Sequence, residues 1–213
     1  MSQTPVQLRN EKLGAKVVRA LENRHFTACY CSTKEEALKT ALSYIPEESA
    51  VSWGGSVTIG EIGLLDAVRK GNYRVIDRDT ASTPEEKTQM MRQALLCDTF
   101  LTSTNALSED GQLVNIDGNG NRVAAMIYGP KQVIVVAGIN KVTKTVEDAM
   151  VRARTIAAPI NAQRFSLKTP CLVNGSCGNC ISADSICAYI VTTRICRPAG
   201  KIKVILVGEE LGF

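Results

Sequence analysis

The sequence predicts an α/β protein with a mostly parallel sheet, because strand-like and helix-like segments alternate through most of its length. The run VIVVA at residues 133–137 is unbroken and apolar, which is typical of a strand buried on both faces of a parallel sheet. Thr33 and Thr83 each stand three residues before a glutamate, the capping pattern that begins a helix. Strands joined through helices of this length imply right-handed crossover connections.

The order of the elements follows from these signals. We expect strands over residues 26–31, 50–53, 73–76, 100–103, 133–137 and 203–208. We expect helices over residues 6–21, 34–44, 84–96 and 146–157, and another that begins near residue 58. Apolar segments at 113–116 and 123–128 predict two more strands, joined as a β-hairpin by the turn DGNGN at 117–121.

The length and composition indicate a single domain with no nucleic-acid partner. The chain has 213 residues, which we divide into a helical lead-in over 1–50 and an α/β domain over 51–213, with a cysteine-rich loop at 169–197. The net charge of +4 is spread along the sequence, and only 5% of the residues are aromatic. This pattern lacks the clustered basic face of a nucleic-acid-binding protein.

The compartment is also predicted from the sequence. The segment MSQTPVQLRNEKLG has no apolar stretch like that of a signal peptide, and no run of apolar residues is long enough to cross a membrane. We therefore expect a cytoplasmic protein without a membrane segment. A reducing compartment keeps disulfides rare, so clustered cysteines there favour a metal or redox site.

The segment TPCLVNGSCGNCISADSIC at 169–187 carries the strongest chemical signal. Its cysteines follow the spacing C-x5-C-x2-C-x6-C, and its glycines leave the loop free to wrap around a metal. Four thiolates from one loop can hold zinc or an iron–sulfur cluster, and the spacing alone leaves both metals open. Cys29 and Cys31, expected on opposite faces of a strand, and Cys97, at a helix end, are interpreted as small buried apolar residues.

A second signal is the turn after the strand at 50–53. Gly54, Gly55 and Ser56 turn the chain into a helix that begins near Thr58. Backbone N–H groups at a helix start bind anions, and glycines allow a ligand to approach closely. A tight strand-to-helix turn explains the same residues equally well, so both interpretations stay open.

A third signal is the polar segment beside the expected hairpin. On spacing only, a hairpin tip is the simpler interpretation, and it explains the glycines better than the density of amide, carboxylate and guanidinium groups next to a core. Such groups bind sugars, carboxylates or phosphates, and an arginine fork suits planar anions. The candidate ligand-binding residues here are Asp117, Gly118, Gly120, Asn121 and Arg122.

Several of these stretches together resemble the LUD, or lactate-utilisation, domain family. The resemblance rests on GGSVTIGEIG, on TSTNALSEDGQLVNIDGNGNRVAAMIYGPKQVIVVAGINKV, on the cysteine motif TPC…GSCGNC…IC, and on the terminal VILVGEELG. It implies a Rossmann-like fold of the NagB/RpiA/CoA-transferase type. Asn105, within the longest of these stretches, is a further candidate ligand-binding residue.

The resemblance also implies a cofactor and partners. It implies that Cys171, Cys177, Cys180 and Cys187 form a [4Fe-4S] binding set, with Cys196 outside it. Relatives work with iron–sulfur partner proteins in oxidising L-lactate to pyruvate. Zinc remains the alternative metal.

Three functional hypotheses follow, and the last of them is a structural or assembly subunit whose metal only orders the C-terminal loop. In the first, the protein is an iron–sulfur component of lactate or related hydroxy-acid utilisation. In the second, it is an isomerase-, transferase- or hydrolase-like enzyme that acts on a small anionic metabolite while the metal loop is structural. Glu61 is then the candidate acid/base or nucleophile by analogy with this fold group, although a solvated residue at a helix start explains it more simply. A second copy of the chain is a further possible partner.

Overall fold

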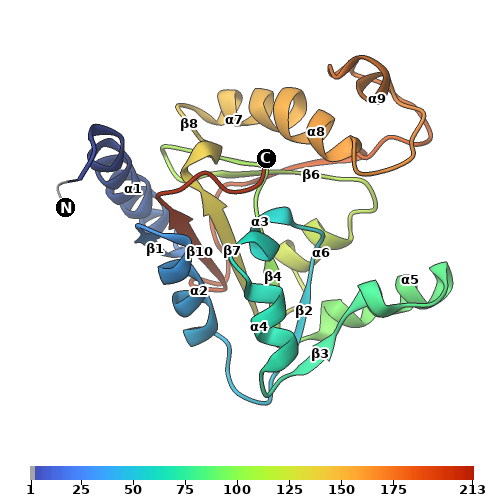
Figure 1. The fold of residues 1–213 in the computed structure, drawn as a ribbon, viewed down its shortest axis with the longest axis horizontal. Coiled ribbons are helices and arrows are strands. Elements are labelled where there is room, and N and C mark those ends of the chain that lie inside the picture. The colour runs from blue at the N-terminus through green and yellow to red at the C-terminus, as the bar shows by residue number, and fades with distance from the viewer. Residues whose placement is uncertain (1–2) are drawn as a thin grey trace.

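The computed structural model describes residues 3–213 and contains two sheets (Figure 1). The larger sheet has six strands in the order β1-β10-β7-β4-β2-β3, and all five neighbouring pairs are parallel. Its strands are β1 (Thr27–Cys31), β2 (Ala50–Trp53), β3 (Arg74–Ile76), β4 (Thr99–Thr102), β7 (Gln132–Gly138) and β10 (Ile202–Val207). The predicted α/β class with a mostly parallel sheet is confirmed.

A smaller, mixed sheet lies beside the larger one. Its order is β8-β5-β6-β9, in which β5 pairs parallel with β8 while β6 pairs antiparallel with both β5 and β9. Its strands are β5 (Ala106–Ser108), β6 (Leu113–Asp117), β8 (Val142–Thr143) and β9 (Tyr189–Thr193). Three of them, β5, β8 and β9, were not predicted, because each is short and lacks a clear alternating pattern.

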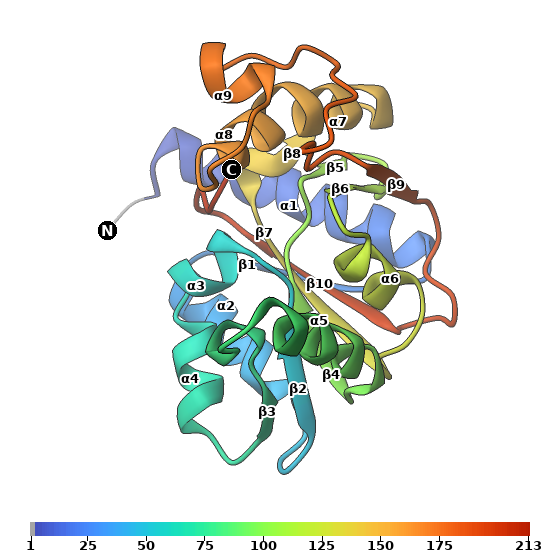
Figure 2. The ribbon, with the colours of Figure 1, turned by 90° about the vertical axis from the view of Figure 1, so that its right-hand side faces the viewer.

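Helices cover both faces of the larger sheet (Figure 2). One face packs against α1 and α6, and the other packs against α2, α3 and α4. The longer helices are α1 (Pro5–Asn23), α2 (Lys34–Ser43), α5 (Pro84–Gln93), α4 (Leu64–Lys70), α6 (Asn121–Ile127) and α7 (Val146–Arg152). The short ones are α3 (Val57–Glu61), α8 (Ala158–Ala162) and α9 (Pro170–Asn174). Across residues 3–213, no helix is both long and apolar enough to cross a membrane.

Strand β7 shows why its sequence is apolar throughout. Val133, Val135 and Ala137 contact the core under α1 and α6. Ile134 and Val136 contact the core under α2, α3 and α4. Successive side chains point to opposite faces of a strand, so burial of both faces demands apolar residues at every position.

The first fifty residues supply β1, which pairs with β10 at one edge of the larger sheet. The prediction that Cys29 and Cys31 lie on opposite faces of this strand is wrong, because residues two apart in a strand share a face. Both side chains contact the core under α2, α3 and α4. A hydrogen bond between the two thiols raises the pKa of Cys29 and lowers the pKa of Cys31.

The predicted β-hairpin over 113–128 is also wrong in its second half. Strand β6 forms as expected, but residues 121–127 form α6, and β6 pairs with β5 and β9 instead. Asp117 Oδ2 accepts hydrogen bonds from the N–H groups of Arg122 and Val123, at 3.0 and 3.1 Å, and so caps this helix. A short apolar run such as VAAMI fits a helix or a strand, and the cap decides for the helix.

Candidate functional site

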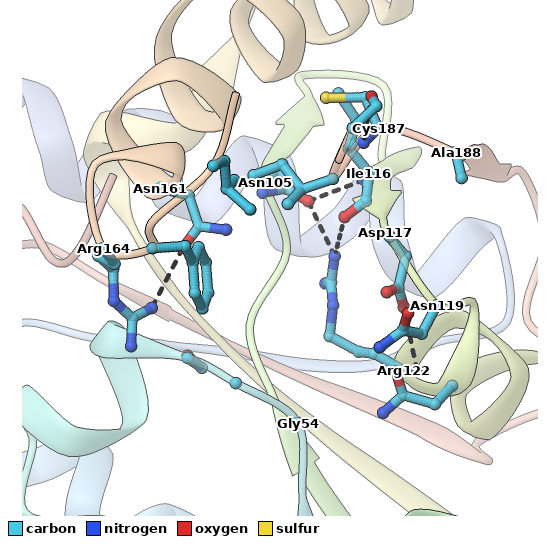
Figure 3. Close-up of a pocket in the computed structure, with 18 of the residues that line it drawn as sticks. Gly54, Asn105, Ile116, Asp117, Asn119, Arg122, Asn161, Arg164, Cys187 and Ala188 are labelled. Atoms are coloured by element: carbon cyan, nitrogen blue, oxygen red, sulfur yellow. Dashed lines mark hydrogen bonds between the residues drawn. The ribbon is translucent and has the colours of Figure 1, made fainter. Parts of the chain in front are cut away.

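A cleft of about 1120 Å³ opens where strands of both sheets end. The segments after the carboxyl ends of β2, β3, β4, β6 and β7 all contribute to it, which is the usual ligand position in an open α/β sheet. It brings together most of the predicted ligand-binding residues, namely Gly54, Gly55, Ser56, Thr58, Asn105, Asp117, Gly118, Asn121 and Arg122. Figure 3 shows Asn161 and Arg164 on one side of the cleft, Asp117 and Arg122 on the other, and Cys187 at its edge.

Two predicted residues do not line this cleft. Gly120 adopts a left-handed conformation with φ of 77° at the start of α6 and packs against the ring of Tyr189. Glu61 is an exposed residue at the end of α3, and its Oε2 accepts a hydrogen bond of 2.7 Å from the N–H of Gly212. Glu61 therefore holds the segment at residue 212, and the structure gives it no contact with the cleft.

The cleft carries an excess of positive charge. Its acidic lining residues are Asp79, Asp117 and Asp184. Its basic lining residues are Arg78, Lys87, Arg122, Lys141 and Arg164. The carboxylate of Asp117 already caps α6, so the charge balance favours an anionic ligand.

Both terminal nitrogens of Arg122 donate hydrogen bonds within the protein. Its Nη1 donates to the Ser103 carbonyl at 3.1 Å and to Asn115 Oδ1 at 2.7 Å. Its Nη2 donates to Asn105 Oδ1 at 3.0 Å and to the Ile116 carbonyl at 2.6 Å. The fork that the sequence suggested for anion binding instead joins the ends of β4 and β6, while its charge remains in the cleft.

The glycine turn has a reason within the protein itself. A Cβ at Gly54 would stand 2.9 Å from Cδ of Arg122, and a Cβ at Gly55 would stand 2.8 Å from Nη2 of Arg78. Helix α3 spans only five residues, so the dipole at its start is weak. Of the two open interpretations, the tight turn is supported, with its glycines making room for two arginine side chains.

Arg78 differs from Arg122 because it has few acceptors in the protein. Its Nε is buried without a hydrogen-bond partner among residues 3–213, and it lies 3.9 Å from Asp79 Oδ1. Its Nη1 contacts only the sulfur of Met91, at 3.6 Å. A guanidinium with unused donors is available to a ligand oxygen.

Lys141 lies at the floor of the cleft, three residues beyond β7. Its side chain is 3% exposed, and its Nζ donates to Thr58 Oγ1 and to Ser103 Oγ, each at 2.9 Å. Burial, with the positive charges of Arg152 and Arg122, lowers the pKa of Lys141 to about 7. This lysine was not predicted from the sequence, although its position just after a buried central strand was a usable signal.

The cysteine loop forms a second, smaller pocket next to the cleft. Cys171, Cys177, Cys180 and Cys187 all line this pocket of about 70 Å³, and none forms a disulfide. Burial raises the pKa of the Cys187 thiol, and the other three thiols add to the rise because they are near. Cys196 lies elsewhere, buried in the core under α1 and α6, where its sulfur accepts the N–H of Ile202 at 3.3 Å.

The donors of this pocket suit a soft metal centre. Within its lining, the four thiols are accompanied by no histidine or carboxylate, and Arg154 supplies a positive charge. In the described part of the chain, no three His, Cys, Asp or Glu side chains are placed closely enough to hold a single metal ion. The four free thiols that line one pocket match a sulfur-ligated cluster in the type of donor, and in that respect alone.

The fold and the cleft define an α/β protein that has a basic cleft beside a cysteine-lined pocket. The family model of the LUD domain matches residues 14–207, and the chain belongs to the LUD domain family. The match includes α2, β1 and most of α1 as well as the later elements. No curated protein gives a significant match.

Two solved structures that match this chain differ in how much they show. A DUF162 family protein from Deinococcus radiodurans has a TM-score of 0.53 and 12% identity, over 93% of this chain and 98% of that chain. At this identity the similarity shows the fold alone. Ribose 5-phosphate isomerase A from Methanocaldococcus jannaschii has a TM-score of 0.35 and 15% identity, over 53% of this chain and 55% of that chain. We draw nothing from a similarity at that score.

Proposed function

We propose that the protein is an iron–sulfur component of lactate or related 2-hydroxy-acid utilisation. Cys171, Cys177, Cys180 and Cys187 would hold a [4Fe-4S] cluster, and the basic cleft would bind the acid. One observation carries the proposal: Cys180 and Cys187 line both the cysteine pocket and the cleft. A ligand in the cleft would therefore lie beside the cluster.

The chemistry must balance electrons and protons. Oxidation of a 2-hydroxy acid to a 2-oxo acid breaks the C–H bond at carbon 2 and the O–H bond, and it releases two electrons and two protons. When bound, a [4Fe-4S] cluster transfers one electron at a time. In this proposal the two electrons pass one at a time to an iron–sulfur partner protein, which is the acceptor, and the two protons pass to the solvent.

The charge of the cleft supports binding of an acid, but its size does not select one particular acid. Its five basic and three acidic lining residues favour an anion, and Arg78 has donors that the protein leaves unused. Its volume of about 1120 Å³ lies at the upper end for small-molecule sites, so acids larger than lactate also fit.

Metal analysis of anaerobically purified protein tests the cluster. We expect iron and sulfide in equal amounts near four per chain, a brown colour, and an EPR signal after reduction. Single Cys→Ser changes at positions 171, 177, 180 and 187 should each lower the iron content. Cys196→Ser is the matched control, because its sulfur lies in the core away from the pocket. Colourless protein with one zinc per chain and no iron would refute the proposal.

A second candidate function is a non-redox enzyme acting on a small anionic metabolite, with a structural metal in the loop. The observation that favours it is Lys141, a buried amine at the cleft floor with a pKa near that of an acid–base catalyst. Turnover of a metabolite by zinc-loaded protein that shows no redox signal would select this candidate over the first.

A further inference from the structure

Lys141 is a buried cation without a matching anion in the protein. Two of its three N–H donors go to the hydroxyls of Thr58 and Ser103, and neither partner carries charge. Among residues 3–213, no carboxylate lies within ion-pair distance of its Nζ. A buried charge without a counter-ion is costly, so the site is incomplete as the protein alone builds it.

The charged groups that face Lys141 make this imbalance larger. Arg122 approaches from α6 and Arg152 from α7, and both oppose a charge on the amine. Among residues 3–213, Glu61 of α3 is the acid whose charge favours the protonated amine, and its Oε2 already accepts a hydrogen bond from the N–H of Gly212. Positive groups therefore outnumber negative ones around this amine.

Neither arginine is free to move away and relieve the excess. Arg152 donates to the carbonyls of Asn140 and Asn105, at 3.0 and 2.6 Å, and Arg122 also donates to the side chain of Asn105. Three cations are thus fixed around the segment that follows β4. An anion bound beside them would offset this positive charge.

We propose that Lys141 binds the carboxylate of a 2-hydroxy or 2-oxo monocarboxylic acid through its third N–H donor. The choice of acid rests on the proposed function, whereas the anion site itself rests on the geometry. The hydroxyls of Thr58 and Ser103 hold the amine in place, and Lys141 lines the cleft where the ligand enters. The preference for a monocarboxylate over a phosphate rests on the proposed function, and titration with inorganic phosphate tests it.

A coupling between binding and protonation follows. The amine of Lys141 has a pKa of about 7 in the free protein, so much of it is neutral at pH 8. A bound carboxylate favours the charged amine and raises this pKa, so the protein takes up a proton as the acid binds. Affinity should then fall by up to about tenfold for each pH unit above 7, until the pH exceeds the raised pKa.

Isothermal titration calorimetry with L-lactate, pyruvate and inorganic phosphate tests this, at pH 6 to 9 in two buffers of different ionisation enthalpy. We expect pyruvate and lactate to bind, with proton uptake at pH 8 that is absent at pH 6. Lys141→Met should lose at least about tenfold in affinity at pH 6 and show no proton uptake. Lys141→Arg keeps a fixed charge, so it should bind without proton uptake at any of these pH values.

Lys201→Met is the matched control. Lys201 is also a buried lysine with a lowered pKa, but its Nζ donates to the Ile127 carbonyl at 3.0 Å and it does not line the cleft. This variant should keep the affinity and proton uptake of the wild type. Thermal unfolding of each variant confirms that it is folded before titration.

Three results would overturn the assignment of Lys141. They are binding of pyruvate without proton uptake, uptake that persists in Lys141→Met, and tighter binding of phosphate than of either acid. Absence of binding by all three compounds would overturn it as well. The cluster proposal fails independently: zinc in the loop together with pyruvate binding and proton uptake would refute the redox role and leave Lys141 as the carboxylate site.

Discussion

The side chain of Arg122 lies so close to Gly54 that a Cβ on this glycine would stand 2.9 Å from Cδ of the arginine. The contact joins the turn after β2 to the start of α6. It shows that two features singled out in the sequence as ligand-binding, a glycine turn and an arginine, are first of all packed against each other.

Replacement of Gly54 by alanine tests this contact. Gly54 does not adopt a positive φ, so Gly54→Ala adds a steric clash without backbone strain. We expect a loss of about 1–3 kcal/mol in the free energy of unfolding, measured by urea denaturation. Gly60→Ala is the control, because no atom lies within 4 Å of the Cβ that alanine would add and alanine favours the helix there. Equal stability of the two variants would show that the side chain of Arg122 moves away from the added Cβ at no measurable cost.

Arginines of the cleft should separate into structural and ligand-binding groups. Arg122→Ala removes four hydrogen bonds and leaves Asn115 Oδ1 without its donor, whereas Asn105 Oδ1 keeps the N–H of Ile116 and the Ser103 carbonyl keeps the hydroxyl of Thr102. An acceptor left unpaired where buried costs about 1–3 kcal/mol, so we expect clear destabilisation. Arg164 is exposed and donates only to Asn161 Oδ1, so Arg164→Ala should change stability by less than about 0.5 kcal/mol. Its pyruvate affinity should fall, because a cleft cation is lost. Urea denaturation and calorimetry measure both effects, and a stable Arg122→Ala variant would contradict the structural role.

The sequence predicted the larger sheet well because its strands have strong local signals. Residues 133–137 and 203–208 are apolar at nearly every position, as strands buried on both faces must be, and they lie within β7 and β10 or overlap them closely. The segment at 123–128 was misassigned because its short apolar run shows neither the periodicity of a helix nor that of a strand. The carboxylate of Asp117 accepts hydrogen bonds from the first turn of the helix, and Ala125 and Met126 pack in the core, which favours the helix.

Much of the cleft was predictable because glycines, amides and carboxylates at strand ends are recognisable in sequence. Lys141 and Arg78 were missed for a physical reason. Their roles depend on burial and on unused hydrogen-bond donors, which arise only when segments distant in the chain meet. Lys141 Nζ, for example, contacts Thr58 and Ser103, which lie 83 and 38 residues away in the chain.

Asp117 should stabilise α6 as a cap, while its negative charge repels an anionic ligand and weakens its binding. Asp117→Ala removes the acceptor for the N–H groups of Arg122 and Val123, so we expect a loss of about 0.5–2 kcal/mol in urea denaturation. Asp117→Asn keeps an acceptor oxygen and should lose much less. Both variants remove a negative charge from the cleft, so both should bind pyruvate more tightly than the wild type. Weaker binding by Asp117→Asn would instead indicate that this carboxylate contacts the ligand.

The pH dependence of the free energy of unfolding should reveal the lowered pKa of Lys141 in the absence of any ligand. Its pKa is lowered from 10.5 to about 7 in the folded protein, so between these values the unfolded chain binds more protons than the folded one. Lys141 therefore adds stability as the pH rises from 7 towards 10.5, and this contribution is lost as the pH falls to 7. Lys141→Met lacks it.

Urea denaturation of the wild type and Lys141→Met at pH 7, 8, 9 and 10 measures this contribution as a difference. Other titrating groups, including Lys201 and Lys203, are common to both proteins and cancel. The wild type should gain up to about 1.4 kcal/mol per pH unit relative to the variant. Over this range, the free energy of unfolding of the variant relative to the wild type is therefore highest at pH 7, where the buried charge of Lys141 destabilises the wild type most. A difference that stays constant over this range would mean that Lys141 keeps an ordinary pKa and that its charge is matched within the protein.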